Sequence, residues 1–508
     1  MKRYATASAL AIVAMAGPSW ADVTPQQVWD DFEAYMTNFG YEITATEAME
    51  GSSLVVSDMT MVVTIPEEDG VIRLVMPPMT FAEAGEGAVS VTYPESGELT
   101  AFFVEGDETV GEIVVAMTHS GLEMMVTGDP GDLTYTYSGD SIGLQLVRIF
   151  DHEEGEEIGR DVVDASMSMG PLSGTSHIMI DDTMRRIEQD MSMGNLALSV
   201  KFDDPEGDEG GMFSMNLTGL SSGGSTYLPL DLDIEDPTSM FKNGGAVDVV
   251  LKHTGGQTEF AFDEGDGPTT GKFSSTGGEF GVAVSETNLT YAISGTGQSV
   301  AMAGPDLPLP ISAELGEVGF ALELPLSPSE EPQPASLSVI LGDFTMDNML
   351  WNIFDPGEVL PRDPATVAFN LNAMVTPFVS LMDTEAMEKL GMTGGVPGEL
   401  NSLTLSDFVV DMVGGVVLGS GAFTFDNTDL DSFDGFPRPE GKLDLQVSGA
   451  NTLIDNLISM GLLPEEDAMG FRMMMSMFTV PGEEPDSMTS TIEVNAEGHV
   501  LANGQRIK

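Results

Sequence analysis

The sequence contains no cysteine and few basic residues. The absence of cysteine excludes disulfide bonds, thiolate zinc sites, cysteine nucleophiles and a cysteine-linked lipid anchor. Only 18 Lys and Arg residues stand against 82 Asp and Glu residues, so the formal net charge is -64. A field of this sign repels phosphate backbones, which excludes nucleic acid as a partner, and it offers no basic patch to an anionic membrane surface.

The first residues have the features of a secretory signal peptide. Lys2 and Arg3 precede an apolar run from Ala5 to Ala16, and Ser19 and Ala21 supply the small residues that signal peptidase requires. The run is about 12 residues long, which is short of the ~20 that a membrane span needs. The pattern therefore predicts cleavage after Ala21 and a location in the periplasm, with no membrane span left after cleavage.

The chain that follows is expected to be mostly β. A helix is predicted over 25–39, with Thr24 as its N-cap and Gln27 completing a capping box. Beyond Gly40 the apolar period changes to two, which is typical of strands, and Gly, Asp, Asn and Pro clusters recur about every ten residues. This spacing favours antiparallel sheet. One of the predicted hairpins joins 247–249 to 260–262 through a turn at Gly255 and Gly256.

The predicted fold is a long, curved, open antiparallel sheet that forms a groove, with short helical inserts and a C-terminal helical pair. Further helices are expected over 347–355, 452–461 and 464–478, and a final hairpin is expected around Glu497 and Gly498. Composition divides the chain approximately into a signal peptide (1–21), an N-terminal helix plus β domain (22–190), a β-rich middle (191–335) and a C-terminal β-plus-helix domain (336–508). One continuous sheet is the alternative to separate domains.

Several motifs resemble a family of exported alphaproteobacterial proteins, the domain of unknown function 2125. They are the sequences Trp351-Asn352-Ile353-Phe354-Asp355-Pro356, Leu360-Pro361-Arg362-Asp363-Pro364-Ala365-Thr366, Pro305-Asp306-Leu307-Pro308-Leu309-Pro310 and the run at 441–464. The resemblance covers roughly 240–508 well and implies a β-rich envelope protein without an assigned activity. More distantly, the chain is similar to β-rich envelope proteins that carry or shield lipids, which is an analogy of fold alone.

The acidic residues suggest one weak metal site. Asp426, Asp429, Asp431 and Asp434 resemble a calcium loop, although the EF-hand register fails, because Phe433 stands fifth from Asp429 where an oxygen ligand is required. Clustered carboxylates can still bind calcium at about millimolar affinity. These four residues are the only metal candidates. No other cofactor is expected.

No catalytic residues are predicted. Ser141 and Ser221 each stand in a Gly-x-Ser-x-Gly pattern, but neither precedes a clear helix, as a nucleophile elbow requires. The methionines at 473–477 are soft enough to bind copper, but the helical spacing favours core packing instead.

These observations predict a non-enzymatic periplasmic envelope protein whose curved sheet shelters an apolar ligand such as lipid. Two alternatives stay open. One is a structural or adhesive envelope module with an acidic surface tuned by calcium, and the other is a hydrolase that uses a pair of acidic residues. A continuous apolar groove would favour the lipid hypothesis, whereas a pocket with perturbed carboxylates would favour the hydrolase.

Overall fold

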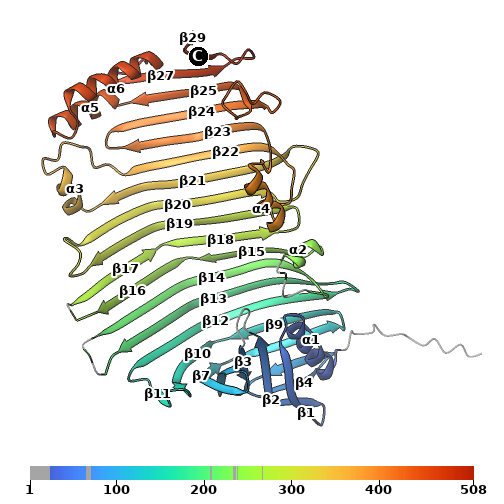
Figure 1. The fold of residues 1–508 in the computed structure, drawn as a ribbon. Helices are drawn as coiled ribbons and strands as arrows, with labels where there is room; N and C mark the ends of the chain where they lie inside the picture. The colour runs from blue at the N-terminus through green and yellow to red at the C-terminus, as the bar shows by residue number, and fades with distance from the viewer. Residues whose placement is uncertain are drawn as a thin grey trace, which may run out of the picture.

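A computed structural model describes residues 23–64, 70–205, 207, 209–232, 236, 238–265 and 267–508, so the predicted signal peptide lies outside the described residues. The described chain forms one antiparallel sheet with six helices, of which α1 (Pro25–Asn38) packs on the face of the sheet (Figure 1). Strands account for 62% of the structure against 12% for helices. The mostly β prediction is confirmed. The sheet runs without interruption through the composition boundaries at 190 and 335.

The sheet begins at the N-terminal end with thirteen strands. They are β1 (Glu42–Glu50), β2 (Ser53–Thr64), β3 (Gly70–Val75), β4 (Met79–Gly85), β5 (Ala88–Thr92), β6 (Ser96–Glu105), β7 (Glu108–Ser120), β8 (Glu123–Asp129), β9 (Asp132–Gly139), β10 (Ser141–Asp151), β11 (Glu156–Ile158), β12 (Val163–Ile180) and β13 (Met184–Asp203). β1 pairs only with β2 among the described strands, so it forms an edge of the sheet.

Sixteen further strands carry the sheet to the C-terminus. They are β14 (Gly210–Pro229), β15 (Ala246–His253), β16 (Gly255–Asp263), β17 (Pro268–Ser275), β18 (Gly277–Val284), β19 (Asn288–Ala303), β20 (Ile311–Pro325), β21 (Gln333–Met346), β22 (Ala365–Pro377), β23 (Gly398–Met412), β24 (Gly415–Asp426), β25 (Arg438–Ser448), β26 (Val480–Pro481), β27 (Ser487–Val494), β28 (Val500–Ala502) and β29 (Gln505–Arg506). The predicted final hairpin is present as β27 and β28.

The four predicted helices are present, with boundaries shifted by a few residues. They are α1 (Pro25–Asn38), α3 (Asn348–Phe354), α5 (Ala450–Ser459) and α6 (Glu465–Phe478). α1 has the predicted capping box between Thr24 and Gln27. Two helices were not predicted, α2 (Ser239–Lys242) and α4 (Thr384–Thr393), and both lie in connections between strands. Within the described residues, the helices are too short or too polar to cross a membrane.

A line of interruptions crosses the sheet at right angles to its strands and divides it into two halves. Several strands have left-handed residues where the line crosses them, among them Gly219 in β14 and Gly297 in β19, with φ of 58° and 54°. Next to these strands the β conformation is interrupted at Thr254, between β15 and β16, and at Thr276, between β17 and β18. Thr254 lies against Gly219, and Thr276 lies against Gly297. We call this line the crease. Interruptions of this kind bend a strand and increase its twist.

The crease explains one wrong prediction. Gly255 and Gly256 do not form a hairpin turn between 247–249 and 260–262. Instead β15 and β16 both pair with β14, at opposite ends of that strand, and they do not pair with each other. β15 and β16 are two segments that together occupy one bent strand position beside β14. The Gly pair marks the bend because residues without side chains tolerate the close approach of neighbouring strands there.

The main hydrophobic core lies beneath α1, at the N-terminal end of the sheet. Trp29 is fully buried and packs against Phe32 and Phe81, with ring centroids 5.6 and 6.0 Å away. Val91 and Leu133 complete the contact from neighbouring strands of the same half of the sheet. We call this half, which contains β4, β5, β8, β9, β15 and β18, the α1-side half. Figure 1 shows α1 against the blue and cyan strands at the N-terminal end, near β4 and β9.

Candidate functional site

The apolar face that α1 covers continues across the sheet far beyond the helix. Cross-strand pairing aligns its side chains in rows that run from strand to strand. One row contains Val249, Val282, Tyr291, Leu322, Leu337, Leu371 and Leu405. A second row contains Leu251, Phe280, Ile293, Phe320, Val339 and Phe369. We call the apolar face of β14 to β25 the trough.

The side chains of the trough are partly open to solvent. Leu251 is 45% exposed, Ile293 44% and Phe320 37%, whereas Phe81 beneath α1 is 3% exposed. Contiguous apolar patches of this kind are uncommon on a soluble protein surface unless they bind something. The trough is therefore the candidate functional site.

The opposite face of the same strands is polar. Ser294 lies next to Ile293, and it stands opposite Glu279 on β18. Glu279 in turn forms an ion pair with Lys252 of β15, with 2.9 Å between Oε2 and Nζ. Because successive side chains of a strand point to opposite faces, this alternation separates an apolar face from a hydrated one.

The half of the sheet beyond the crease contributes aromatic side chains. Phe260 of β16 stands opposite Phe213 of β14, and its ring centroid lies 5.4 Å from that of Phe262 and 6.2 Å from that of Phe273. Phe262 and Phe273 are 48% and 41% exposed. Both halves of the sheet therefore present apolar groups.

The two halves meet in a hollow of about 460 Å³ at the crease. Leu217 lies before the bend in β14, and Met191, Phe280, Ile293 and Val318 lie on the α1-side half. Apolar side chains from both halves thus line this hollow, together with polar residues that include Lys252, Glu279 and Gln298. A continuous apolar groove along the sheet stays a prediction.

A buried ion pair lies between α1 and β13, next to the N-terminal end of the trough. Arg185 on β13 donates from Nη2 to Oδ1 of Asp31 on α1 at 2.8 Å, and both side chains are nearly inaccessible. The hydroxyl of Tyr135 donates to the other carboxylate oxygen of Asp31 at 3.0 Å. Burial, together with the neighbouring Asp31 carboxylate, raises the pKa of Tyr135, so this phenol stays protonated.

The motif at 351–366 forms a polar anchor. Asp355 is completely buried and accepts hydrogen bonds from the backbone N–H groups of Val359 and Leu360 at 2.9 and 3.0 Å. Burial raises the pKa of this carboxyl, but the two backbone donors and Arg362 together lower it by more. The pKa of Asp355 is therefore below its ordinary value. Arg362 also donates to the backbone oxygen of Asp355 and lies over the ring of Trp351. These contacts give the motif a structural role.

A family model described as "Uncharacterized protein conserved in bacteria (DUF2125)" matches residues 232–504. The chain belongs to this family. The match covers β15 to β28, most of the trough and the anchor around Asp355. No curated protein and no solved structure matches the chain. Membership in the DUF2125 family confirms the resemblance read from the motifs and assigns no activity.

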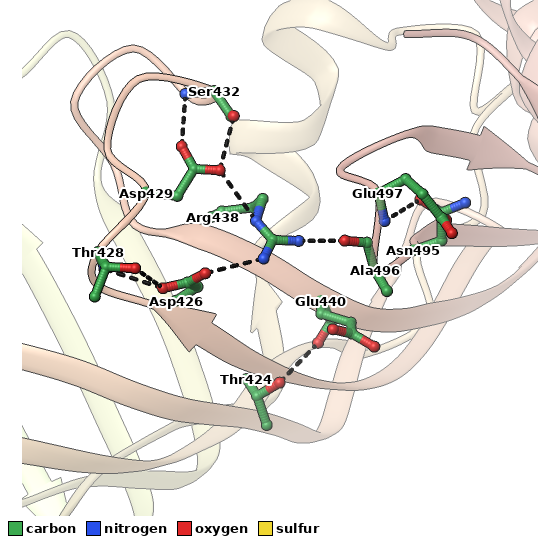
Figure 2. A network of polar contacts seen from close by, with 10 residues as sticks. All are labelled: Thr424, Asp426, Thr428, Asp429, Ser432, Arg438, Glu440, Asn495, Ala496 and Glu497. Carbon is green, nitrogen blue, oxygen red and sulfur yellow. Dashed lines mark hydrogen bonds and ion pairs between the residues drawn. The ribbon is translucent and has the colours of Figure 1, made fainter.

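The acidic cluster proposed as a calcium site lies in the loop between β24 and β25 (Figure 2). Arg438 stands between two of its members: its Nη2 contacts Oδ2 of Asp426 at 2.9 Å, and its Nε contacts Oδ2 of Asp429 at 3.1 Å. Hydrogen bonds from Thr428, and then Arg438, lower the pKa of Asp426 to about 2. A protein cation therefore already neutralises part of this cluster.

The other two candidates, Asp431 and Asp434, are exposed in the same loop, and Asp434 has a φ of 54°. Among the residues that the structure describes, no three His, Cys, Asp or Glu side chains are grouped to hold a metal ion. Weak calcium binding at Asp426, Asp429, Asp431 and Asp434 remains a prediction.

The serines of the two Gly-x-Ser-x-Gly patterns lie in strands. Ser141 begins β10, and Ser221 lies within β14 on the α1 side of the crease. Neither stands on a turn from a strand into a helix, so the backbone strain that exposes a catalytic serine is missing from both positions.

The methionines of α6 do not pack in the core, contrary to prediction. Met473 is 65% exposed, Met474 51% and Met477 64%, and only Ala468 is buried in this helix. α6 lies beside α5 at the margin of the last strands, where the sheet offers little surface to cover (Figure 1). Helical spacing alone could not reveal that the facing surface is absent.

Acidic residues follow both margins of the sheet, at the ends of the strands. At the α1-side margin they include Asp181, Asp182, Glu286, Glu330 and Glu331, and at the opposite margin Asp203, Glu264 and Asp306, all of them exposed. The trough is thus apolar along its floor and negatively charged along its margins.

Proposed function

We propose that this protein is a non-enzymatic envelope protein that holds the acyl chains of lipids on its trough. The observation that supports the proposal is the alignment of apolar side chains across strand after strand with no element covering them in the described structure. The predicted signal peptide supports a periplasmic location, where lipids in transit between membranes need shelter from water.

The dimensions and chemistry of the trough suit an extended hydrocarbon chain. From β14 to β25 the trough crosses ten strand positions, because β15 with β16 and β17 with β18 each occupy one position. Neighbouring strands are about 4.8 Å apart, so the trough is roughly 43 Å long. Each methylene group that leaves water for an apolar surface gains about 0.8 kcal/mol. The trough has aliphatic and aromatic side chains and few polar groups on its floor, which gives affinity for a chain without selecting its exact length.

The charge distribution argues against the membrane surface itself as the resident partner. The acidic margins lie on both sides of the trough, so approach to an anionic bilayer is opposed by repulsion. Single lipid molecules avoid most of this cost because only one headgroup approaches the margin. We therefore infer that the protein binds individual lipids and does not lie flat on a membrane.

Charge substitutions on the two faces test the proposal. We expect Ile293→Glu combined with Phe320→Glu to abolish binding of a fluorescent acyl-chain probe and to remove lipids that copurify with the protein, as measured by mass spectrometry. An acyl chain that lies over these positions would bury both carboxylates without a partner, which costs free energy and so weakens lipid binding.

The matched control is Ser294→Glu, which adds a charge to the polar face one residue from Ile293. It should leave probe binding and copurifying lipid unchanged. Equal loss in both variants, or no lipid and no probe binding in the unmodified protein, would contradict the proposed function.

A further inference from the structure

Arg185 has donors that the protein does not use. Its side chain is 3% exposed, and Nη2 is engaged with Asp31, but Nε and Nη1 are buried without a hydrogen-bond partner. The guanidinium carbon lies 5.2 Å from the centre of the Tyr35 ring, a contact that occupies a face of the group and not its N–H bonds. Buried N–H groups without acceptors are uncommon and costly, so they indicate a missing partner.

These donors belong to a side chain that lines a cavity. The cavity has a volume of about 250 Å³ and lies between α1 and the sheet. Its walls combine the apolar Met79 and Phe81 with the phenols of Tyr93 and Tyr135 and with Arg185. Burial raises the pKa of Tyr93, so its hydroxyl remains a neutral hydrogen-bonding group. Complete binding sites for ligands of drug size are usually larger, which suits a cavity that holds one end of a long molecule.

The cavity opens onto the same face as the trough. Ile187 and Gln189 line it, and on β14 they stand opposite Thr226 and Gly224. Those residues in turn stand opposite Val247 and Val249, where the rows of the trough begin. A chain lying along the trough toward α1 therefore arrives at the Arg185 cavity within two strands.

We propose that the Arg185 cavity binds the acyl oxygen of the lipid, either the carboxyl of a fatty acid or the ester carbonyl of a glycerolipid, while the hydrocarbon chain lies in the trough. This inference rests on the proposed function. The unused N–H groups call for an oxygen acceptor. Asp31 balances the charge of Arg185, so a neutral or singly charged acceptor suits the site better than a doubly charged phosphate.

Three amphiphiles with the same sixteen-carbon chain test the inference on the full mature protein. They are hexadecanoic acid, its methyl ester and hexadecyltrimethylammonium, each below its critical micelle concentration. The acid and the ester carry an acyl oxygen, whereas the ammonium compound carries a cation that the acidic margins attract. We expect the acid or the ester to bind at least tenfold more tightly than the ammonium compound. The affinity for the acid compared with that for the ester distinguishes a fatty acid from a glycerolipid as the ligand.

A double variant, Asp31→Asn with Arg185→Met, removes the cation and its counter-ion together, because Arg185→Met alone would leave Asp31 buried without its partner. Binding of the acid or ester should fall about tenfold, and binding of the ammonium compound should stay unchanged. The control is Arg472→Met, which removes an exposed arginine paired with Asp455 on the C-terminal helices and should change nothing.

The outcomes separate the two proposals. If the unmodified protein binds none of the three compounds, the proposed function fails and this inference fails with it. If all three bind equally and the double variant binds as the unmodified protein does, the trough holds chains but Arg185 does not read the acyl oxygen. The order of affinities in the unmodified protein is decisive even if the double variant does not fold.

Discussion

The N-terminal end of the sheet and the rest of the sheet present the same apolar face, but α1 covers this face only at the N-terminal end. Beneath α1, Phe81 and Leu133 are 3% and 1% exposed and belong to a packed core. On β15 and β19, Leu251 and Ile293 are 45% and 44% exposed. The strands have the same alternation in both regions, so the difference arises from the helix that covers one of them. A strand pattern can therefore build a core or a binding surface, and the covering element decides which.

The largest effect on stability is expected where the packing of α1 against the sheet is disrupted. Trp29→Ala should lower the free energy of unfolding by about 3–5 kcal/mol, because the fully buried indole fills the space between α1 and the sheet. The measurement is chemical denaturation followed by circular dichroism. Trp351→Ala on α3, a helix without buried residues, is the control and should cost roughly 1 kcal/mol. Similar losses in both variants would show that the covered region is not a distinct core.

Hydrogen exchange compares the two regions directly. Amide protons of β4, β5, β8 and β9 should exchange more slowly than those of β16 to β20, by about tenfold or more, because apolar cover raises the local opening free energy. Peptide-level exchange measured by mass spectrometry provides both values in one experiment. Uniform protection along the sheet would indicate a single cooperative unit and would contradict the distinction.

The C-terminal end of the sheet depends on polar contacts where the N-terminal end depends on an apolar core. The folded pKa of Asp426 is about 2, below the unfolded value of about 3.9. Its stabilising contribution is present above the unfolded value and is lost as the pH falls through about 2. The 427–437 loop contains Leu430, Phe433 and Phe436, which pepsin can cleave.

We expect pepsin to spare this loop at pH 4 and to cut it near pH 2. Asp426→Asn should make the loop sensitive already at pH 4, because Arg438 loses one of its two carboxylate partners. Asp431→Asn, an exposed residue of the same loop, is the control and should behave as the unmodified protein does. Resistance of the Asp426→Asn loop at pH 4 would show that the network does not hold it closed.

Salt should have the smallest effect. The net charge of -64 repels itself in the folded state, and charges on neighbouring strands still interact at a Debye length of about 8 Å in 0.15 M salt. The melting temperature should therefore rise with sodium chloride. Calcium at matched ionic strength should add to this rise if Asp426, Asp429, Asp431 and Asp434 bind it. A melting temperature that does not change with sodium chloride would contradict the repulsion argument. Equal melting curves with and without calcium, at matched ionic strength, would contradict calcium binding by these residues.

Period-two patterns and end signals were enough to predict much of the fold. The capping box at Thr24 and Gln27 located α1, and the period-two pattern beyond Gly40 predicted antiparallel strands. These features are local, so each can be read from a few neighbouring residues. The DUF2125 family was also identified from local motifs around Trp351 and Asp355.

The crease could not be predicted because a glycine in a turn and a glycine in a bend have the same local sequence. Gly255 and Gly256 suggested a hairpin, and only the pairing of β15 and β16 with a single strand distinguishes the two arrangements. The Arg185 cavity was missed for a similar reason. Arg185 and Asp31 are 154 residues apart, and no local pattern brings them together.

Site-specific photocrosslinking tests the central claim, that the uncovered apolar face holds lipid chains. A photoreactive amino acid is placed at Phe280, Ile293 or Phe320 on the trough, and at Ser294 or Ala321 on the opposite face, in the intact bacterium. After irradiation, mass spectrometry of the purified protein should find lipid adducts at the three trough positions and none at the other two. Adducts at neither face, or equally at both, would contradict the account.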